Sequence, residues 1–322
     1  MEKNSNISQI KKWLIIVNPN AGRRKIEKDW DEIAELLYNA GISYERVFTK
    51  HKYHAIELSK TYIEKGYKNI ISVGGDGTMN EVINGIFLQK KYPTTEITLG
   101  MITVGTGNDW ARTYKIPSDY KKAIEIIKKG KTFVQDAGIV TYDENGERKK
   151  RHFVNIAGMG YDALVATKTN AMKEKKKGGP FAYLYNLVIG LFQYKNLHLK
   201  ITIDDKQIFN GAVFSLSIGI CKYNGGGIMQ LPNSIPDNGI FDITLIKKTT
   251  KLRVIKNLAK LYDGTFIKMK EVETFTGKEI TVSSQPKNLS LIEAEGESLG
   301  HSPLHFEIVP KSISLIVNKI PG

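Results

Sequence analysis

The sequence predicts an α/β domain followed by an antiparallel β domain. In the first 134 residues, short apolar runs alternate with segments of helical periodicity, which is typical of a mostly parallel sheet covered by helices. From residue 135 onward, strand patterns separated by turn residues dominate. The length of 322 residues also suits about two domains. We therefore expect one domain at 1–134 and a second at 135–309.

Four strands and four helices are expected in the first domain. Apolar runs closed by turn residues predict strands at 13–17, 44–48, 69–73 and 98–104. Apolar residues at three- and four-residue spacing predict helices at 29–38, 55–64, 80–87 and 120–129. Gly41 and Gly66 follow the first two helices and are expected to end them.

The second half is expected to consist mainly of strands. They are predicted at 136–142, 151–156, 198–203, 211–220, 241–246, 279–284, 290–294 and 305–308. Two helical segments, 182–194 and 252–262, interrupt them. A last strand at 313–317 can join either domain.

Composition and charge narrow the classes of function. The 47 Lys and Arg residues exceed the 33 Asp and Glu residues, so the net charge of +14 favours an anionic partner. The single cysteine, Cys221, excludes an internal disulfide and a zinc site of several cysteines. No apolar run reaches the ~20 residues of a membrane span, and we expect a cytosolic protein. His51 and His54 are not expected to bind metal, since no carboxylate accompanies them at zinc spacing.

Three glycine-bearing loops each follow a predicted strand of the first domain: Asn18–Gly22, Gly74–Thr78 and Gly105–Asp109. Loops at the carboxyl ends of parallel strands line one crevice, and glycine lets backbone N–H groups approach phosphate oxygens. Neither a Walker A loop nor a Gly-x-Gly-x-x-Gly motif with its acidic partner is present. The loops predict a phosphate site of another kind, although turns that only connect strands to helices remain an alternative.

Two aspartates in these loops have two interpretations each. Asp76 lies between Gly75 and Gly77, where a carboxylate can hold Mg²⁺ or orient a phosphate–metal complex. It can equally serve as the N-cap of the following helix. Asp109 can likewise cap a helix near Ala111.

These motifs resemble those of the diacylglycerol kinase catalytic-domain family of lipid kinases. The run Gly74-Gly75-Asp76-Gly77-Thr78-Met79-Asn80-Glu81-Val82 looks like its signature, and its core also occurs in NAD kinases. The loops at 18–22 and 105–112 are similar to two further family motifs. Residues 153–163 and Gly225-Gly226-Gly227 with Pro232 look like markers of the family's second domain. The resemblance covers nearly the whole chain in order.

The resemblance implies a Rossmann-like ATP-binding domain and an antiparallel β-sandwich that takes the lipid. It implies ATP and Mg²⁺ as cofactors, and a terminal segment, 310–322, that returns to the first domain. The nucleotide-binding residues implied are Asn18, Pro19, Asn20, Ala21, Gly22, Thr49, Gly74, Gly75, Gly77, Thr78, Asn80, Glu81, Gly105, Thr106 and Asn108.

The resemblance also assigns the chemistry. Glu297, in the run Glu295-Gly296-Glu297, corresponds to the family's general base, and Asp76 is the second catalytic residue. Asp109, Asp136 and Glu295 are expected to form a supporting network, with Glu295 standing where the family has Asp. Glu293, Glu295 and Glu297 as one solvated strand face is the alternative. Asp237 and Asn238 match a family Mg²⁺ site in which Asn238 replaces an Asp.

The function expected is therefore an ATP-dependent lipid kinase. Diacylglycerol, giving phosphatidic acid, is the first choice of acceptor, and a sphingoid base or ceramide is the second. NAD kinase and a non-catalytic lipid- or nucleotide-binding regulator are the remaining alternatives. Basic runs at 148–151 and 173–177, the latter beside an apolar segment at 181–192, predict docking on the inner face of a membrane. The expected partners are a membrane lipid substrate and anionic phospholipid, with a homodimer left open and no nucleic acid.

Overall fold

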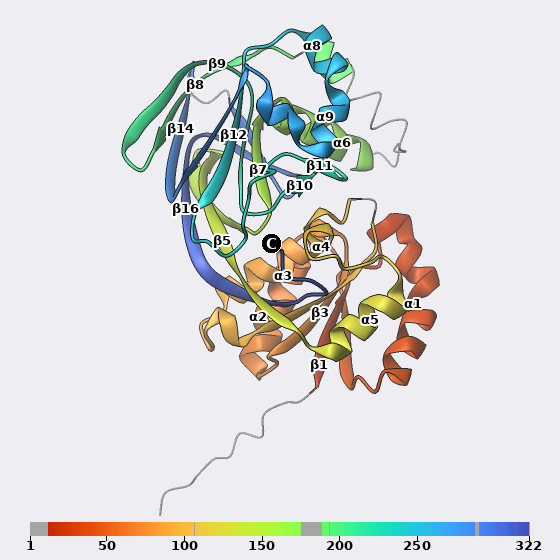
Figure 1. Ribbon diagram of the computed structural model, residues 1–322. Helices are drawn as coiled ribbons and strands as arrows, with labels where there is room; N and C mark the ends of the chain where they lie inside the picture. The colour runs from red at the N-terminus through yellow and green to blue at the C-terminus, as the bar shows by residue number, and fades with distance from the viewer. Residues whose placement is uncertain (1–11, 106, 175–188, 193, 287–289, 322) are drawn as a thin grey trace, which may run out of the picture. The chain divides into compact units, whose positions relative to one another are not determined.

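The computed structural model describes residues 12–105, 107–174, 189–192, 194–286 and 290–321 (Figure 1). The contacts between residues divide the chain into two compact units. Within the described ranges, unit 1 comprises 12–105, 115–134 and 313–320, and unit 2 comprises 107–114, 135–312 and residue 321.

Unit 1 is built on a parallel sheet. Its strands are β1 (Trp13–Val17), β2 (Tyr44–Phe48), β3 (Asn69–Gly74), β4 (Thr98–Thr103) and the end of β16 (Glu297–Ile316). They lie in the order β2-β1-β3-β4-β16, and every neighbouring pair is parallel. Ser314 and Leu315 of β16 pair with Thr98 and Leu99 of β4, so the end of the chain completes this sheet.

Helices cover both faces of the sheet (Figure 1). The helices α1 (Ala21–Asn39) and α5 (Tyr120–Lys129) share one apolar core with the strands, in which Ile15 and Val17 of β1 face α1. Because successive strand residues point to opposite faces, Leu14 and Ile16 are buried on the other side. There α2 (His54–Lys65) packs against α3 (Asp76–Leu88). A single 3₁₀ turn, η1 (Thr94–Glu96), precedes β4.

The predicted α/β class is confirmed, but two helices begin earlier than predicted. The helix predicted at 29–38 begins at Ala21, and the one predicted at 80–87 begins at Asp76. The missed parts, 21–28 of α1 and 76–79 of α3, contain glycine and several polar or charged residues, with too few apolar residues to show a helical period. Ala21, Gly22, Gly77 and Thr78 are therefore residues of helical first turns rather than of free loops.

Unit 2 consists mainly of antiparallel strands. They are β5 (Thr132–Glu144), β6 (Glu147–Phe153), β7 (Ile156–Gly160), β8 (Leu197–Ile203), β9 (Lys206–Gly219), β10 (Tyr223–Asn224), β11 (Ile228–Met229), β12 (Phe241–Lys247), β13 (Val272–Gly277), β14 (Glu279–Gln285), β15 (Leu291–Ala294) and most of β16. The helical pieces are α4 (Asp109–Thr113), α6 (Tyr161–Glu174), α8 (Lys251–Lys256), α9 (Leu258–Asp263) and η2 (Thr265–Lys268).

Two long strands join the layers of this β-sandwich. The first part of β9 pairs with β8, and its last part pairs with β7 and β12. β16 pairs first with β15 and then with β14, which in turn pairs with β8. The strands β8, β9, β7, β15, β16 and β14 therefore form a closed circuit that leaves these six without a free edge. Phe153 stacks on Phe241 and meets the edge of Phe306 in the core.

The sandwich predicted from the family resemblance is confirmed, with several boundaries corrected. The strand predicted at 151–156 is two strands, β6 and β7, separated at Val154 and Asn155. Strand β13 was not predicted, and the helix predicted at 252–262 is divided at Asn257 into α8 and α9. The strands predicted at 305–308 and 313–317 are one strand. The helix predicted at 182–194 lies mostly outside the described residues.

Close packing of α2 on α3 generates a prediction about stability. A Cβ added at Gly85 of α3 would lie 1.8 Å from Ser59 Oγ and 2.5 Å from the Ile56 carbonyl oxygen of α2. Gly85→Ala is therefore expected to lower the free energy of unfolding by about 2 kcal/mol, measured by thermal melting. The same substitution in a Ser59→Ala background should recover only part of this loss, because the Ile56 carbonyl remains. An unchanged melting temperature would show that α2 and α3 are loosely packed.

Candidate active site

The carboxyl ends of three strands meet in unit 1, as the sequence predicted for its glycine loops. The backbone N–H of Asn18, after β1, donates to Val73 O of β3 at 3.0 Å, and the N–H of Val104, after β4, donates to Gly74 O at 2.8 Å. The side-chain Nδ2 of Asn18 donates to Thr78 Oγ1 at 2.9 Å. A Cβ at Gly22 would come within 2.8 Å of the Val104 side chain, so glycine is required there. These contacts hold the first two loops together beside the end of β4.

The turn from β3 into α3 presents a helix N-terminus at this edge. Gly75 is the N-cap residue in an extended conformation, and Asp76 is the first helical residue, half-buried. The interpretation of Asp76 as the N-cap is therefore wrong. A Cβ at Gly74 would lie 2.6 Å from Thr78 Oγ1, so the close turn depends on glycine. The first N–H groups of a helix have no intrahelical acceptor and favour anions, which suits phosphate oxygens.

The glutamate of this motif has a positioning role within unit 1. Glu81 is buried, and its carboxylate accepts hydrogen bonds from the N–H groups of Tyr53 at 3.0 Å and Ala55 at 3.1 Å. It thereby fixes the start of α2 against α3. Thr49, which precedes Tyr53 in the sequence, is also buried, and its N–H donates to Val17 O at 2.9 Å. Direct contact of Thr49, Asn80 or Glu81 with a nucleotide remains a prediction.

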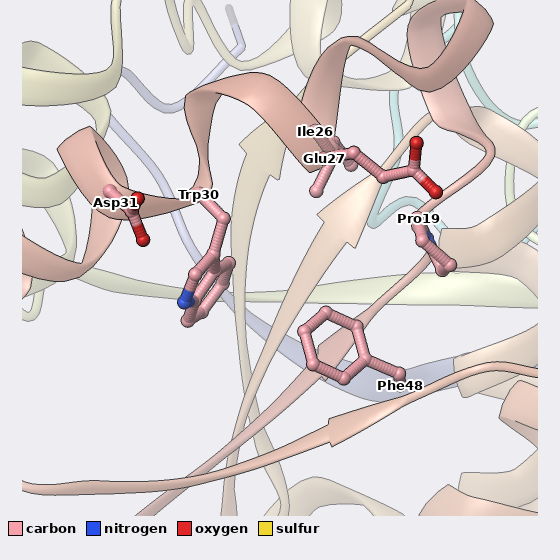
Figure 2. Close-up of a pocket in the computed structure, with 6 residues that line it drawn as sticks. All are labelled: Pro19, Ile26, Glu27, Trp30, Asp31 and Phe48. Carbon is pink, nitrogen blue, oxygen red and sulfur yellow. The ribbon is translucent and has the colours of Figure 1, made fainter.

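A pocket lies beside the Asn18–Gly22 segment (Figure 2). It has a volume of about 340 Å³ and is lined by Pro19, Ile26, Glu27, Trp30, Asp31 and Phe48. The rings of Trp30 and Phe48 meet edge to face at 5.9 Å, and the guanidinium of Arg46 lies 4.8 Å from each ring centroid. Because two carboxylates and no glycine amide line it, the pocket does not suit a triphosphate.

The third glycine loop is divided between the units. Gly105 belongs to unit 1, Thr106 lies outside the described residues, and Asn108 and Asp109 belong to unit 2. Asn108 is the N-cap residue of α4 in a left-handed conformation, so Asp109 is not the cap. These two residues are therefore described with the sandwich.

Asp109 connects α4 to the Gly225–Gly227 loop within unit 2. Its Oδ2 accepts a hydrogen bond from Gly226 N at 2.7 Å, and its Oδ1 lies 3.6 Å from Arg112 Nε. Burial raises the pKa of Asp109, opposed by the N–H groups of Gly226 and Gly227 and by Arg112. Gly227 in turn lies against the Arg112 guanidinium. The sequence identified Asp109 as a supporting residue but gave no sign of this partner.

Within the run Glu295-Gly296-Glu297, the first two residues form the tight turn between β15 and β16. Glu295 and Gly296 have φ values of 57° and 76°, the left-handed pair typical of a two-residue hairpin. Oε1 of Glu295 accepts hydrogen bonds from Val154 N at 2.8 Å and Asn155 N at 2.7 Å. Glu295 therefore anchors the turn to the β6–β7 junction. The alternative in which the three glutamates line one solvated strand face is wrong, because Glu295 lies in the turn and Glu293 is buried.

Glu297 is the first residue of β16 after that turn. Its carboxylate lies 3.6 Å from Arg151 Nη2 of β6, and the two side chains are 17% and 11% exposed. Among the described residues, none donates a hydrogen bond to its buried Oε2. A carboxylate oxygen held beside a cation without a hydrogen-bond donor is available to accept a proton from a bound molecule.

A buried acidic pair lies behind the same turn and was not predicted from the sequence. Glu293 Oε2 accepts a hydrogen bond from Gly296 N at 2.8 Å, and its Oε1 accepts one from Asn224 Nδ2 at 3.1 Å. Asp162 accepts hydrogen bonds from Ser215 Oγ at 2.6 Å and Ser217 Oγ at 3.2 Å. Burial, together with the charge of Asp162, raises the pKa of Glu293 to about 8. Only the alternation of glutamates at 293, 295 and 297 could have drawn attention to Glu293.

The loop that contains Asp237 and Asn238, the predicted Mg²⁺ site, is held in place by Asp136. Asp136 is fully buried, and its two oxygens accept hydrogen bonds from Gly239 N and Lys311 N, both at 2.7 Å. Burial raises its pKa, and the charge of Asp237 adds to that effect. The exposed Asn238 already accepts a hydrogen bond from Ile240 N at 3.2 Å. Both oxygens of Asp136 and the amide oxygen of Asn238 already accept backbone hydrogen bonds, so Asp237 is the one carboxylate left. This set does not fit the oxygen cage that Mg²⁺ prefers, and we derive no step through a cation here.

The expectation that no carboxylate accompanies His51 and His54 is wrong. Potential ligand atoms of His51, His54 and Glu57 lie within 4.8 Å of one another, the one such group in the described part of the chain. However, His54 Nδ1 accepts a hydrogen bond from Lys50 N at 3.0 Å. The proton of the neutral ring is then on Nε2, which leaves neither nitrogen with a lone pair for a metal. We therefore assign no metal to this group.

The raised pKa of Glu293 predicts how stability depends on pH. Between its ordinary pKa and about 8, the unfolded chain is ionised at Glu293 while the folded chain keeps the proton, so stability falls as pH rises. In Glu293→Gln, the free energy of unfolding should fall less than in the wild type between about pH 5 and about pH 8. Urea denaturation across this range measures the effect. The control is Glu125→Gln, exposed on α5, which should keep the wild-type slope. Equal slopes for all three proteins would contradict the assignment.

Comparisons with known proteins agree with this arrangement. Residues 12–140 match the diacylglycerol kinase catalytic domain, and residues 155–317 match the YegS C-terminal NAD kinase beta sandwich-like domain. A diacylglycerol kinase of Staphylococcus carnosus is 28% identical over 308 residues, which cover 95% of this chain and 94% of the relative. The crystal structure of a diacylglycerol kinase from Bacillus anthracis matches with a TM-score of 0.74 and 26% identity, covering 96% of this chain and 97% of that one.

A more distant structure shares the fold alone. An NAD kinase from Archaeoglobus fulgidus in complex with ATP has a TM-score of 0.54 and 13% identity, covering 95% of this chain and 94% of that one. Among the described helices, none combines the length and apolar character needed to cross a membrane. With one family model matched in each half, the chain belongs to the diacylglycerol kinase catalytic-domain family of lipid kinases and is a phosphotransferase.

Proposed function

We propose that this protein transfers the γ-phosphate of ATP to the hydroxyl group of a lipid, with diacylglycerol as the acceptor and phosphatidic acid as the product. The observation that carries the proposal is the carboxylate of Glu297, with a buried oxygen that has no hydrogen-bond donor among the described residues. A lipid alcohol needs such a group to take its proton while its oxygen attacks phosphorus.

The proposed phosphate transfer breaks two bonds and forms two. The lipid O–H bond breaks as its proton passes to Glu297, and the lipid oxygen forms a bond to the γ-phosphorus. The bond from the γ-phosphorus to the bridging oxygen breaks, and ADP leaves with the electron pair. Arg151, 3.6 Å from Glu297, holds that carboxylate in place.

Unit 1 supplies the groups that suit the triphosphate. The first amides of α3 are donors for phosphate oxygens, and Asn18 is held to Thr78 at the same edge. Asp76, in the first turn of α3, is the residue that would bind Mg²⁺ carried by the nucleotide, which neutralises charge on the transferred phosphate. The Archaeoglobus NAD kinase, which shares the fold, was crystallised in complex with ATP, and this supports the choice of nucleotide.

Other acceptors are weaker candidates. The curated relatives are named for diacylglycerol, which favours it over a sphingoid base or ceramide. The hairpin that presents Glu297 favours a lipid kinase over an NAD kinase, and it argues against a non-catalytic regulator. Because the acceptor resides in a bilayer, we further propose that the protein works at the inner face of a membrane.

The direct test is phosphate transfer from γ-labelled ATP into a total lipid extract, with products identified by mass. We expect labelled phosphatidic acid, formed only when a divalent cation is present. Labelled sphingoid phosphates or ceramide phosphate would replace the proposed acceptor. Formation of NADP from NAD and ATP, with no labelled lipid, would overturn the lipid-kinase assignment.

Glu297 provides the sharpest variant. Glu297→Gln keeps the size of the side chain but cannot accept the proton, so we expect kcat to fall by about 10²- to 10⁴-fold, with KM for ATP little changed. Glu307→Gln, the same substitution later in β16, is the control and should retain wild-type kcat. Near-normal turnover in Glu297→Gln would remove this residue from the role of base.

A further inference from the structure

We propose that the helices α8 and α9 form a docking surface for an anionic lipid bilayer. The surface, called the α8–α9 surface below, is defined by Phe192, Lys251, Leu252, Ile255, Lys256, Lys260 and Tyr262. It lies wholly within unit 2 and outside the residues assigned above to catalysis. The inference rests on the proposed function only for the choice of a lipid surface as the occupant.

Neither helix contains a buried residue, which is unusual for helices on a folded domain. Leu252 is 62% exposed, Ile255 38% and Tyr262 59%, although such side chains normally pack inward. Phe192 is also 59% exposed and lies beside Lys251, whose Nζ is 5.6 Å from the Phe192 ring centroid. Exposed large apolar side chains one turn apart on a helix, such as Leu252 and Ile255 of α8, are typical of an interaction surface.

The anchoring of α8 explains why these side chains point outward. Val254 packs against the apolar cluster of Tyr161, Val165, Leu191 and Phe214. The neighbouring Arg253 forms an ion pair with Glu271 at 3.0 Å. Figure 1 shows α8 and α9 near α6, to the right of the strands β9 and β12. With positions 253 and 254 used to hold the helix, Leu252 and Ile255 are left exposed.

The positive charge of the α8–α9 surface favours an anionic partner. Lys251, Lys256 and Lys260 form no ion pair with any residue that the structure describes, whereas Lys247 and Arg253 nearby are paired with Glu273 and Glu271. Lys251 Nζ donates a hydrogen bond to the Phe192 carbonyl oxygen, which leaves its charge without an acidic partner. Apolar side chains interleaved with lysines whose charge is not neutralised match the boundary between acyl chains and anionic headgroups. Tyr262 adds an aromatic ring with a polar tip, the kind of residue enriched at that boundary. Nucleic acid would use the lysines but leave the apolar side chains in water.

This surface differs from the one expected from the sequence. The basic run at 173–177 and the apolar segment at 181–192 were predicted to dock on the membrane, and they lie largely outside the described residues. Phe192 is the one member of that segment in the α8–α9 surface. The other residues of the α8–α9 surface lie in or next to the helix predicted at 252–262. No contact with a membrane was predicted for that helix.

Vesicle co-sedimentation of the full-length protein without ATP tests the proposal. The wild type should bind vesicles of mixed phosphatidylglycerol and phosphatidylcholine, and bind pure phosphatidylcholine vesicles weakly. Leu252→Ser should lower the partition coefficient about tenfold, and Lys256→Glu with Lys260→Glu should lower it by at least about 25-fold, since each lysine is worth roughly fivefold. The matched controls are Leu88→Ser at the exposed end of α3 and Lys121→Glu with Lys128→Glu on α5, which should bind like the wild type.

Activity on short-chain diacylglycerol in detergent micelles separates the two proposals. Both α8–α9 variants should phosphorylate this acceptor at the wild-type rate, which also shows that they are folded. Wild-type vesicle binding in both variants, or equal loss in the controls, would overturn the docking surface while leaving the kinase assignment intact. Binding to DNA instead of vesicles, or loss of a dimer without loss of vesicle binding, would also overturn it. Failure of the wild type to phosphorylate any lipid would count against the proposed function alone.

Discussion

Buried carboxylates that accept backbone N–H groups from distant segments of the chain are the constraint on which both units depend. Burying a charge is costly unless it is hydrogen-bonded, and such bonds are stronger than neutral ones. Glu81 accepts the N–H groups at the start of α2, and Glu295 accepts those of the β6–β7 junction. Asp136 and Asp109 hold the loops at Gly239 and Gly226 in the same way. Each bond fixes a loop that would otherwise be free to move, and most of these loops carry a family motif.

Buried hydrogen bonds also hold Glu293 and Glu295 near Glu297, but the three glutamates have different surroundings. Glu295 is satisfied by two N–H groups, and Glu293 is buried beside Asp162 with its pKa raised to about 8. Glu297 instead has a cation, Arg151, and a buried oxygen with no donor among the residues described. Three glutamates at alternate positions therefore have three roles: anchor, protonated buried group and candidate base. Environment rather than residue type separates them.

Two residues at which this sequence departs from the motifs of the family resemblance have hydrogen-bond partners in the structure. Glu295 replaces an Asp, and its longer side chain reaches the N–H groups of Val154 and Asn155. Asn238 replaces an acid, and it accepts a hydrogen bond within its own turn, while Asp136 holds that loop through Gly239. A buried carboxylate therefore helps to hold this loop in place. The apolar residues of the α8–α9 surface, by contrast, remain largely exposed, so they contribute little to the stability of the fold.

The sequence by itself determined the alternation of strands and helices in unit 1, the strand-rich second half and the motifs that identify the family. Local periodicity and glycine placement carry that information, because both depend on neighbours in the chain. Tertiary structure decided where α1 and α3 begin, that β9 and β16 close the sandwich, and that Glu293 lies buried beside Asp162. It also decided which acids are satisfied, since their partners at Gly226, Val154 and Lys311 lie far away in the sequence. Hydrogen bonds and burial between such distant residues leave no periodic trace in the sequence, so only the folded chain reveals them.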